Sequence, residues 1–171
     1  MPIRIFTDGA SRGNPGPGGW GAIISTEKKV IELGGRKDRA TNNRMELSAA
    51  INALEHVREE NFANLGDLAA DDKKVQLFSD SKYVIMGITE WIFGWQRKGW
   101  KTADRKTVLN RDLWERLANA AKGLKIEWKY VAGHTGHSGN ERCDEIATLY
   151  ADGENVHLYS GAREKYPIKL F

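Results

Sequence analysis

The chain has 171 residues, of which 40% are hydrophobic and 29% are charged. This length fits a single domain, because domains cluster at ~100 to 200 residues and a chain this long can bury a sizeable core. The sequence contains no run of about 18 apolar residues, and it opens directly into an alternating segment instead of a basic, then apolar leader. We therefore expect a mature cytoplasmic protein with no membrane span. A single cysteine, Cys143, excludes an internal disulfide and suits a reducing compartment.

The net charge of +3 hides an uneven distribution of charged residues. Residues 82–129 hold 11 lysine and arginine residues against 5 aspartate and glutamate residues, whereas the rest of the chain holds 15 against 18. Such segregation indicates a polyanionic partner for the basic region and a cation-binding site elsewhere. A solvated helical surface is the plainer alternative, and charge counts alone do not exclude it.

The first part of the chain predicts three strands followed by a helix. Short runs that alternate or are rich in β-branched residues predict strands at Ile3–Asp8, Gly21–Thr26 and Val30–Leu33. The first two strands are separated by the Gly- and Pro-rich loop Gly9–Gly19, and connections this short predict an antiparallel meander. From Met45 onward the apolar residues follow a helical period, with Asn43 and Glu46 placed like a capping pair.

The remaining elements alternate between strands and helices. Two further strands are expected at Val75–Phe78 and Ile126–Val131, and three further helices at Val84–Trp95, Asp112–Lys122 and Asn140–Asp152. Strands separated by helices pair in parallel through right-handed crossovers. The order therefore predicts a single-domain α/β fold, with a five-stranded mixed sheet made of the meander and parallel strands and flanked by helices.

Two segments fit this plan less well. Asn61–Lys74 is a long polar connection, and Gly153–Phe171 follows the last predicted helix. Apolar residues alternate in this tail, as they would in a docked strand, at Tyr166, Ile168 and Leu170. We expect a catalytic domain of residues 1–152 and a C-terminal extension of residues 153–171 that can dock on it.

Four carboxylates stand at positions that one edge of the sheet can bring together. Asp8 and Asp80 each follow directly on a predicted strand, and functional sites gather at the carboxyl ends of strands in parallel α/β sheets. Glu46 lies in the first turn of one predicted helix, and Asp144 lies in the first turns of another. If the two strands are neighbours, all four side chains can converge.

Such a cluster needs cations. Two like charges ~4 Å apart repel by roughly 4 kcal/mol at an effective dielectric constant of about 20. Two Mg²⁺ ions would balance four carboxylates, and ions ~3.5 to 4 Å apart can stabilise both the attacking and the departing oxygens of an in-line displacement. Singly, each carboxylate has a plainer interpretation as a turn residue, a helix cap or a solvated charge. Only their joint placement favours a metal-dependent nuclease.

The glycine-rich loop Gly133–Gly139 carries two histidines. His134 precedes Asp144 by ten residues, so a flexible loop could bring its imidazole to a water or a leaving oxygen at the carboxylates, where it would carry a proton. Alternatively, His134, His137 and Cys143 could be three zinc ligands, although no fourth ligand stands at a suitable spacing. A purely structural histidine is the third interpretation.

The segment Trp91–Lys106 interleaves four aromatic residues with five cations and a single acid. Aromatic faces can pack on sugars and bases while cations contact phosphates. We expect partial burial of Trp91 and Trp95, which lie on the helical stripe, and an exposed contact for Trp100, which lies beyond it. The cations that would meet phosphates are Arg97, Lys98, Lys101, Arg105 and Lys106.

Several motifs in order resemble the bacterial type 1 ribonuclease H family. They span residues 3 to about 152 and are Phe6–Gly9, Gly13–Gly19, Thr41–Leu47, Ser79–Ser81, Gly99–Asp104, Gly133–His137 and Asn140–Asp144. The resemblance implies hydrolysis of the RNA strand of RNA/DNA hybrids on a five-stranded mixed sheet. It also implies two Mg²⁺ ions, with Mn²⁺ as a possible substitute, held by Asp8, Glu46, Asp80 and Asp144, with His134 assisting proton transfer or product departure.

The same resemblance implies a set of substrate contacts. Minor-groove contacts are implied for Asn14 and Asn43, and contacts with a DNA phosphate for Thr41, Asn42 and Ser81. The segment Trp91–Lys106 resembles the family's basic protrusion along the DNA strand. Independently, a wide minor groove that presents 2′-hydroxyls can be read by short amides and by backbone groups near Gly9 and Ser11.

Two positions depart from the family pattern, because Ser11 stands where relatives often carry Cys and Lys82 where they often carry Gln. We expect a monomer with no obligate protein partner. Two alternatives remain on the same fold, namely a catalytically idle nucleic-acid-binding module and a related nuclease that acts on DNA. The intact carboxylate set argues against the first, and the amide-rich loops and basic protrusion argue against the second.

Overall fold

The structure is a computed structural model that describes residues 1–61, 74–133 and 137–170. Most of the predicted polar connection Asn61–Lys74, together with His134, lies outside the described residues. In the part of the chain that is described, no helix combines the length and the apolar composition needed to cross a membrane.

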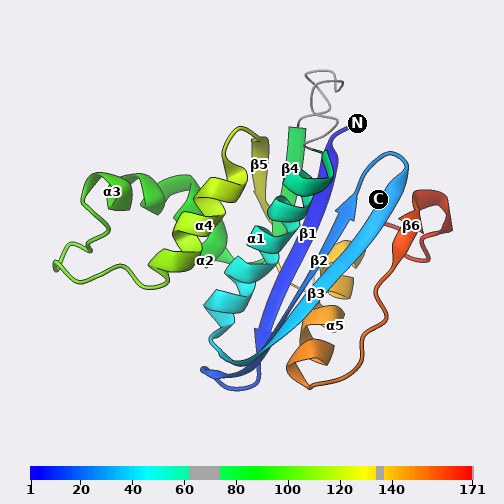
Figure 1. Ribbon diagram of the computed structural model, residues 1–171, viewed down its shortest axis with the longest axis horizontal. Coiled ribbons are helices and arrows are strands. Elements are labelled where there is room, and N and C mark those ends of the chain that lie inside the picture. The colour runs from blue at the N-terminus through cyan, green and yellow to red at the C-terminus, as the bar shows by residue number, and fades with distance from the viewer. Residues whose placement is uncertain (62–73, 134–136, 171) are drawn as a thin grey trace.

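A mixed sheet forms the centre of the molecule (Figure 1). Its strands lie in the order β5-β4-β1-β2-β3-β6 and span Ile3–Ser11 (β1), Gly16–Ser25 (β2), Lys29–Ala40 (β3), Lys74–Ser79 (β4), Lys125–Tyr130 (β5) and Ser160–Ala162 (β6). β1, β2 and β3 form the predicted antiparallel meander, and β4 and β5 extend the sheet in parallel from β1. The α/β class and the mixed sheet are therefore confirmed.

The predicted number of five strands is wrong, because the tail adds a sixth. β6 pairs antiparallel with Lys29–Ile31 at the edge of β3. This strand lies earlier in the tail than the alternating residues suggested, and Arg163–Lys165 then form a 3₁₀ turn. Ser-Gly-Ala is too short and too polar to show a period-2 apolar pattern, so its strand character comes from pairing with β3 and not from its own sequence.

Helices cover both faces of the sheet. α1 (Asn42–Asn61) and α4 (Arg111–Ala121) lie on one face, and α5 (Ser138–Ala151) lies on the other (Figure 1). The larger core fills the space under α1 and α4 and includes fully buried Leu47, Ile51 and Trp114. A smaller cluster of Phe6, Ile23, Val30 and Cys143 lies under α5, where the tail residues Tyr159, Tyr166 and Leu170 pack against it.

α1 begins three residues earlier than the apolar period indicates, and its cap differs from the prediction. Thr41 Oγ1 accepts a hydrogen bond from the backbone N–H of Arg44 at 3.3 Å, which is the contact expected of an N-cap residue. The expected capping pair of Asn43 and Glu46 is therefore wrong. Asn43 lies inside the helix, and the Glu46 carboxyl interacts with Asp8 instead of the helix end.

The predicted second helix, Val84–Trp95, is interrupted. It consists of α2 (Lys82–Met86), a π-helical turn (Gly87–Trp91) and α3 (Ile92–Arg97). Gly87 begins the π-helical turn, and a Cβ there would lie 2.0 Å from the ring of Trp114. The glycine therefore lets the backbone of this segment rest directly on an indole of α4.

Replacing Gly87 should show how much this contact matters. We expect Gly87→Ala to lower the free energy of unfolding by about 1–3 kcal/mol, because the added methyl group overpacks against the Trp114 ring. Gly94→Ala is the matched control, since a Cβ at Gly94 meets nothing within 4 Å, and it should leave stability unchanged or raise it by about 0.5–1 kcal/mol. Chemical denaturation would measure both, and equal effects would contradict the packing explanation.

Candidate active site

Asp8 and Asp80 are brought together by neighbouring strands. β1 and β4 pair in parallel with Thr7 opposite Ser79, so the two aspartates follow at the same level of the sheet. The prediction that these strands are neighbours is confirmed. Asp8 does not end its strand, however, because β1 continues to Ser11 through its pairing with β2.

Glu46 reaches the same place from α1 because the helix approaches β1 very closely. A Cβ on Gly9 would lie 2.4 Å from the backbone nitrogen of Glu46, so only glycine leaves room for the helix there. The backbone N–H of Gly9 donates to Asp8 Oδ1 at 2.9 Å, which holds that carboxylate. Gly9 thus shapes the site through its missing side chain.

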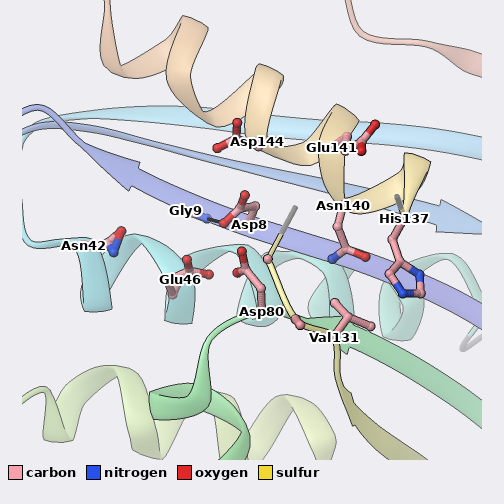
Figure 2. A pocket seen from close by; sticks show the side chains of 12 residues that line it. Asp8, Gly9, Asn42, Glu46, Asp80, Val131, His137, Asn140, Glu141 and Asp144 are labelled. Carbon is pink, nitrogen blue, oxygen red and sulfur yellow. Dashed lines mark hydrogen bonds between the residues drawn. The ribbon is translucent and has the colours of Figure 1, made fainter. Parts of the chain in front are cut away.

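One carboxylate oxygen from each of Asp8, Glu46 and Asp80 can be chosen so that all three lie within 4.8 Å of one another. Asp144 joins them from α5 and lines the same pocket, whose volume is about 260 Å³ (Figure 2). Asp8 and Glu46 are buried, Asp80 is half-buried and Asp144 is exposed. The four predicted carboxylates therefore surround one cavity and come from β1, α1, α5 and the end of β4.

The electrostatics of this pocket favour a cation. Burial raises the pKa of Asp8 to about 7, and the charge of Asp80 adds to the effect. Burial, followed by the charge of Asp8, also raises the pKa of Glu46 well above its ordinary value. Glu46 Oε2 is buried and has no hydrogen-bond partner among the residues that the structure describes. Divalent cations that prefer oxygen ligands, such as Mg²⁺, fit this donor set.

Among the described residues, Cys143 is poorly suited to the alternative zinc site. Its thiol is buried in the small core under α5 and donates a hydrogen bond to the carbonyl oxygen of Phe6 at 3.2 Å. Burial raises the pKa of this thiol, which opposes the thiolate form that zinc requires. His137 lines the acidic pocket instead, and the predicted proton carrier His134 lies outside the described residues.

Asn140 is a pocket residue that the sequence analysis did not single out. Its side-chain amide donates to the carbonyl oxygens of Thr7 and Phe78, at 3.4 and 3.1 Å, and so joins α5 to both aspartate-bearing strands. Glu141 lines the pocket as well. The i, i+4 spacing of Asn140 and Asp144, which places both on one face of a helix, was the signal available in the sequence.

Of the polar residues predicted to contact substrate, Asn42 lines the pocket, and the others lie on the segments that begin or end near it. Asn14 Oδ1 accepts a hydrogen bond from the backbone N–H of Asn42 at 3.0 Å, which ties the β1–β2 turn to the start of α1. Ser81 caps α2 by accepting from the backbone N–H of Val84 at 3.2 Å. Asn43 and Lys82 are exposed, and Thr41 and Ser11 are half-buried.

The prediction that Trp100 makes an exposed contact is wrong. Its side chain is buried at 8% exposure, whereas Trp91 is exposed at 37% and Trp95 is half-buried. Trp100 has a left-handed backbone with φ of 61°, and its N–H donates to the carbonyl of Trp95 at 2.7 Å, so the chain folds back onto α3. This tertiary contact buries a residue that lies beyond the helical stripe. The cations Arg97, Lys98 and Lys101 remain exposed.

An acidic pocket beside β1 and the end of β4, with an exposed cationic segment on the same chain, is the arrangement expected of a nucleic-acid hydrolase. A sequence model of the ribonuclease H (RNase H) family matches residues 2–152, and the chain belongs to this family. It is a hydrolytic endoribonuclease, and its reaction is the cleavage of the RNA strand in RNA/DNA hybrids.

Similar proteins share most of the chain. A ribonuclease H from Novosphingobium aromaticivorans is 51% identical over 146 residues, which cover 85% of this chain and 94% of that protein. A ribonuclease H from Cyanothece sp. is 49% identical over 156 residues, which cover 91% of this chain and 92% of that protein. The solved structure of LC9-RNase H1, a type 1 RNase H, matches with a TM-score of 0.75 at 25% identity and covers 99% of this chain and 82% of that chain.

Mg²⁺ should raise the melting temperature of this protein more strongly at about pH 8 than at about pH 5. The pKa of Asp8 is raised from 3.8 to about 7, so a protonated Asp8 stabilises the ion-free protein at low pH and this contribution is lost as the pH rises through 7. Mg²⁺ requires the ionised carboxylate, so protons compete with it at low pH.

Thermal unfolding with Mg²⁺ and with chelator, at both pH values, measures this difference. Asp8→Asn is the control, because it removes the titrating ligand and should flatten the pH dependence of the shift. A Mg²⁺-induced shift of equal size at both pH values would contradict the assignment.

Proposed function

We propose that this endoribonuclease cuts the RNA strand at the acidic pocket, with Asp8, Glu46, Asp80 and Asp144 as ligands of two Mg²⁺ ions and with Mn²⁺ as a possible substitute. The observation that carries the proposal is the convergence of four carboxylates, from four separate elements, on one cavity. When bound, such ions polarise the phosphodiester and lower the pKa of water.

The protein's own part in this chemistry is to hold charged groups in place. Asp8 is fixed by the Gly9 N–H, and Glu46 is fixed by the close contact of α1 with β1. Both carboxyl groups are buried, so their charges would act on a bound cation with little screening by water. Asp144 is exposed and completes the set from the open side, where a phosphate can enter. His134 is proposed as the proton carrier at the leaving oxygen.

We further propose that polar groups around the pocket read the hybrid. Asn14 and Asn43, with the backbone near Gly9 and Ser11, would face the minor groove, where 2′-hydroxyls distinguish RNA from DNA. The bond from Asn42 to Asn14 keeps the β1–β2 turn beside the start of α1, which supports a continuous contact surface. A DNA phosphate would be bound by Thr41, Asn42, Ser81 and Lys82.

The basic segment after α2 would bind the DNA strand outside the pocket. Arg97, Lys98 and Lys101 are exposed, and Trp91 presents a partly open ring next to Trp95. Trp100 is not included, because its ring is buried. In this proposal residues 1–152 form the catalytic domain, residues 153–171 form a docked extension, and the enzyme acts as a cytoplasmic monomer.

Asp8→Asn should abolish cleavage and leave metal-free hybrid binding largely intact, because it removes a metal ligand without touching the phosphate-binding groups. The assay uses labelled RNA/DNA hybrid, duplex RNA and duplex DNA, each with Mg²⁺ and with chelator. Asp38→Asn is the matched control, since it makes the same change on an exposed carboxylate of β3. Full turnover by Asp8→Asn would overturn the mechanism, and cleavage of duplex DNA by the unaltered protein would favour the DNA nuclease.

The double variant Lys98→Ala with Lys101→Ala should weaken hybrid binding and lower the slope of log K against log salt by about 1–2, because each phosphate contact releases about one counterion. The control is Lys28→Ala with Lys125→Ala, which removes two exposed cations at the opposite end of the sheet. If the two double variants shift the slope equally, the basic segment does not track the hybrid.

A further inference from the structure

Glu32 of β3 is a buried carboxylate away from the acidic pocket, and its side chain is 2% exposed. Arg142 donates to both of its oxygens, from Nε at 2.7 Å and from Nη2 at 3.0 Å. The hydroxyl of Tyr166 and the backbone N–H of Tyr159 donate to it at 2.7 and 2.9 Å. Burial alone would raise the pKa of Glu32, but these hydrogen bonds hold it below its ordinary value. The carboxylate is therefore ionised and fully bonded.

The groups around Glu32 come from two places. Arg142 belongs to α5, whereas Tyr159 and Tyr166 belong to the C-terminal segment, beyond residues 2–152 that the family model matches. Arg142 also donates to the carbonyl oxygen of His157 at 3.2 Å, and the two tyrosine rings pack with centroids 4.9 Å apart. Glu32 thus joins β3, α5 and the tail in one buried polar cluster.

The close contact between α5 and the sheet shows why this cluster matters for the position of the helix. A Cβ on Gly19 would lie 2.1 Å from the carbonyl oxygen of Ala147, and one on Gly21 would lie 2.6 Å from that of Cys143. At these two positions the helix backbone therefore lies directly on β2, which offers no side chain to pack against it. Side contacts must therefore add to the small core in fixing the position of α5, and the buried Arg142–Glu32 pair is one of them.

We propose that the C-terminal segment, residues 157–166, positions Asp144 for metal binding by completing the hydrogen-bond shell of Glu32 and so fixing Arg142. Asp144 lies two residues after Arg142 and is the member of the quartet that α5 supplies. Asp8 lies on β1, Asp80 directly follows β4 and Glu46 lies on α1, and β1 contacts both β4 and α1 directly. Glu32 and Tyr166 are positioning residues. The inference rests on the proposed role of Asp144 as a ligand.

The test is the Mg²⁺ affinity of the full-length, ion-free protein, measured by titration calorimetry well below the melting temperature. We expect Glu32→Gln to raise the Kd for Mg²⁺ by roughly tenfold, the lower end of what losing an outer-shell partner costs, and Tyr166→Phe to raise it by less. Hybrid binding in chelator should not change. Tyr166→Phe removes only a hydroxyl. If Glu32→Gln fails to fold, the Kd of Tyr166→Phe for Mg²⁺ decides the test.

Glu55→Gln is the matched control, because it breaks a bidentate Arg116–Glu55 pair of 2.9 Å between α1 and α4, away from α5. It should lower the melting temperature and leave the Kd for Mg²⁺ unchanged. Variants at Glu32 and Tyr166 that lower the melting temperature but bind Mg²⁺ like the unaltered protein would overturn the inference and show a purely structural role.

Asp144→Asn separates this inference from the proposed ligand set. If Asp144→Asn weakens Mg²⁺ binding and Glu32→Gln adds nothing in that background, the effect of Glu32 passes through Asp144. If Asp144→Asn leaves the Kd unchanged, the ligand set itself fails. If Asp144→Asn weakens binding while Glu32→Gln alone does not, only the positioning role fails.

Discussion

Repulsion between like charges is the constraint around which this molecule is arranged. Asp8, Glu46 and Asp80 offer oxygens within 4.8 Å of one another, in surroundings that raise the pKa of Asp8 to about 7. Side chains on flexible loops would move apart under such repulsion. Here they are attached to a paired strand, to the first turns of a helix and to the end of a neighbouring strand, so separating them would require breaking the sheet or its main core.

The fold holds these carboxylates near one another because helix and strand backbones approach very closely. Gly9 lets α1 reach β1 next to Glu46, and Gly19 and Gly21 let α5 lie on β2. Glycine brings elements near each other but supplies no side chain to fix their position. Polar contacts take over that task, through Asn140 at the start of α5 and through Arg142 with Glu32 at its side.

The acidic pocket and the basic segment carry opposite charges and lie in different parts of the molecule. The acidic pocket lies between α1 and α5, while the exposed cations after α2 lie on a segment that projects from the body beside α4 (Figure 1). Aromatic packing gives this segment a defined shape, since Trp95 contacts both Trp100 and Trp114. The basic surface is therefore supported by the same core that holds α1, so packing fixes its position relative to the acidic pocket.

The sequence by itself determined the order of the main elements, the mixed sheet and the four carboxylates, because period, turn chemistry and strand ends are local properties that each segment shows alone. Tertiary structure decided the sixth strand, the cap at Thr41, the burial of Trp100 and the place of Asn140. In each case the residue's state depends on a partner remote from it or on the path of the backbone. Ser160–Ala162 is a strand because β3 has a free edge there, and Trp100 is buried because the chain turns back onto Trp95.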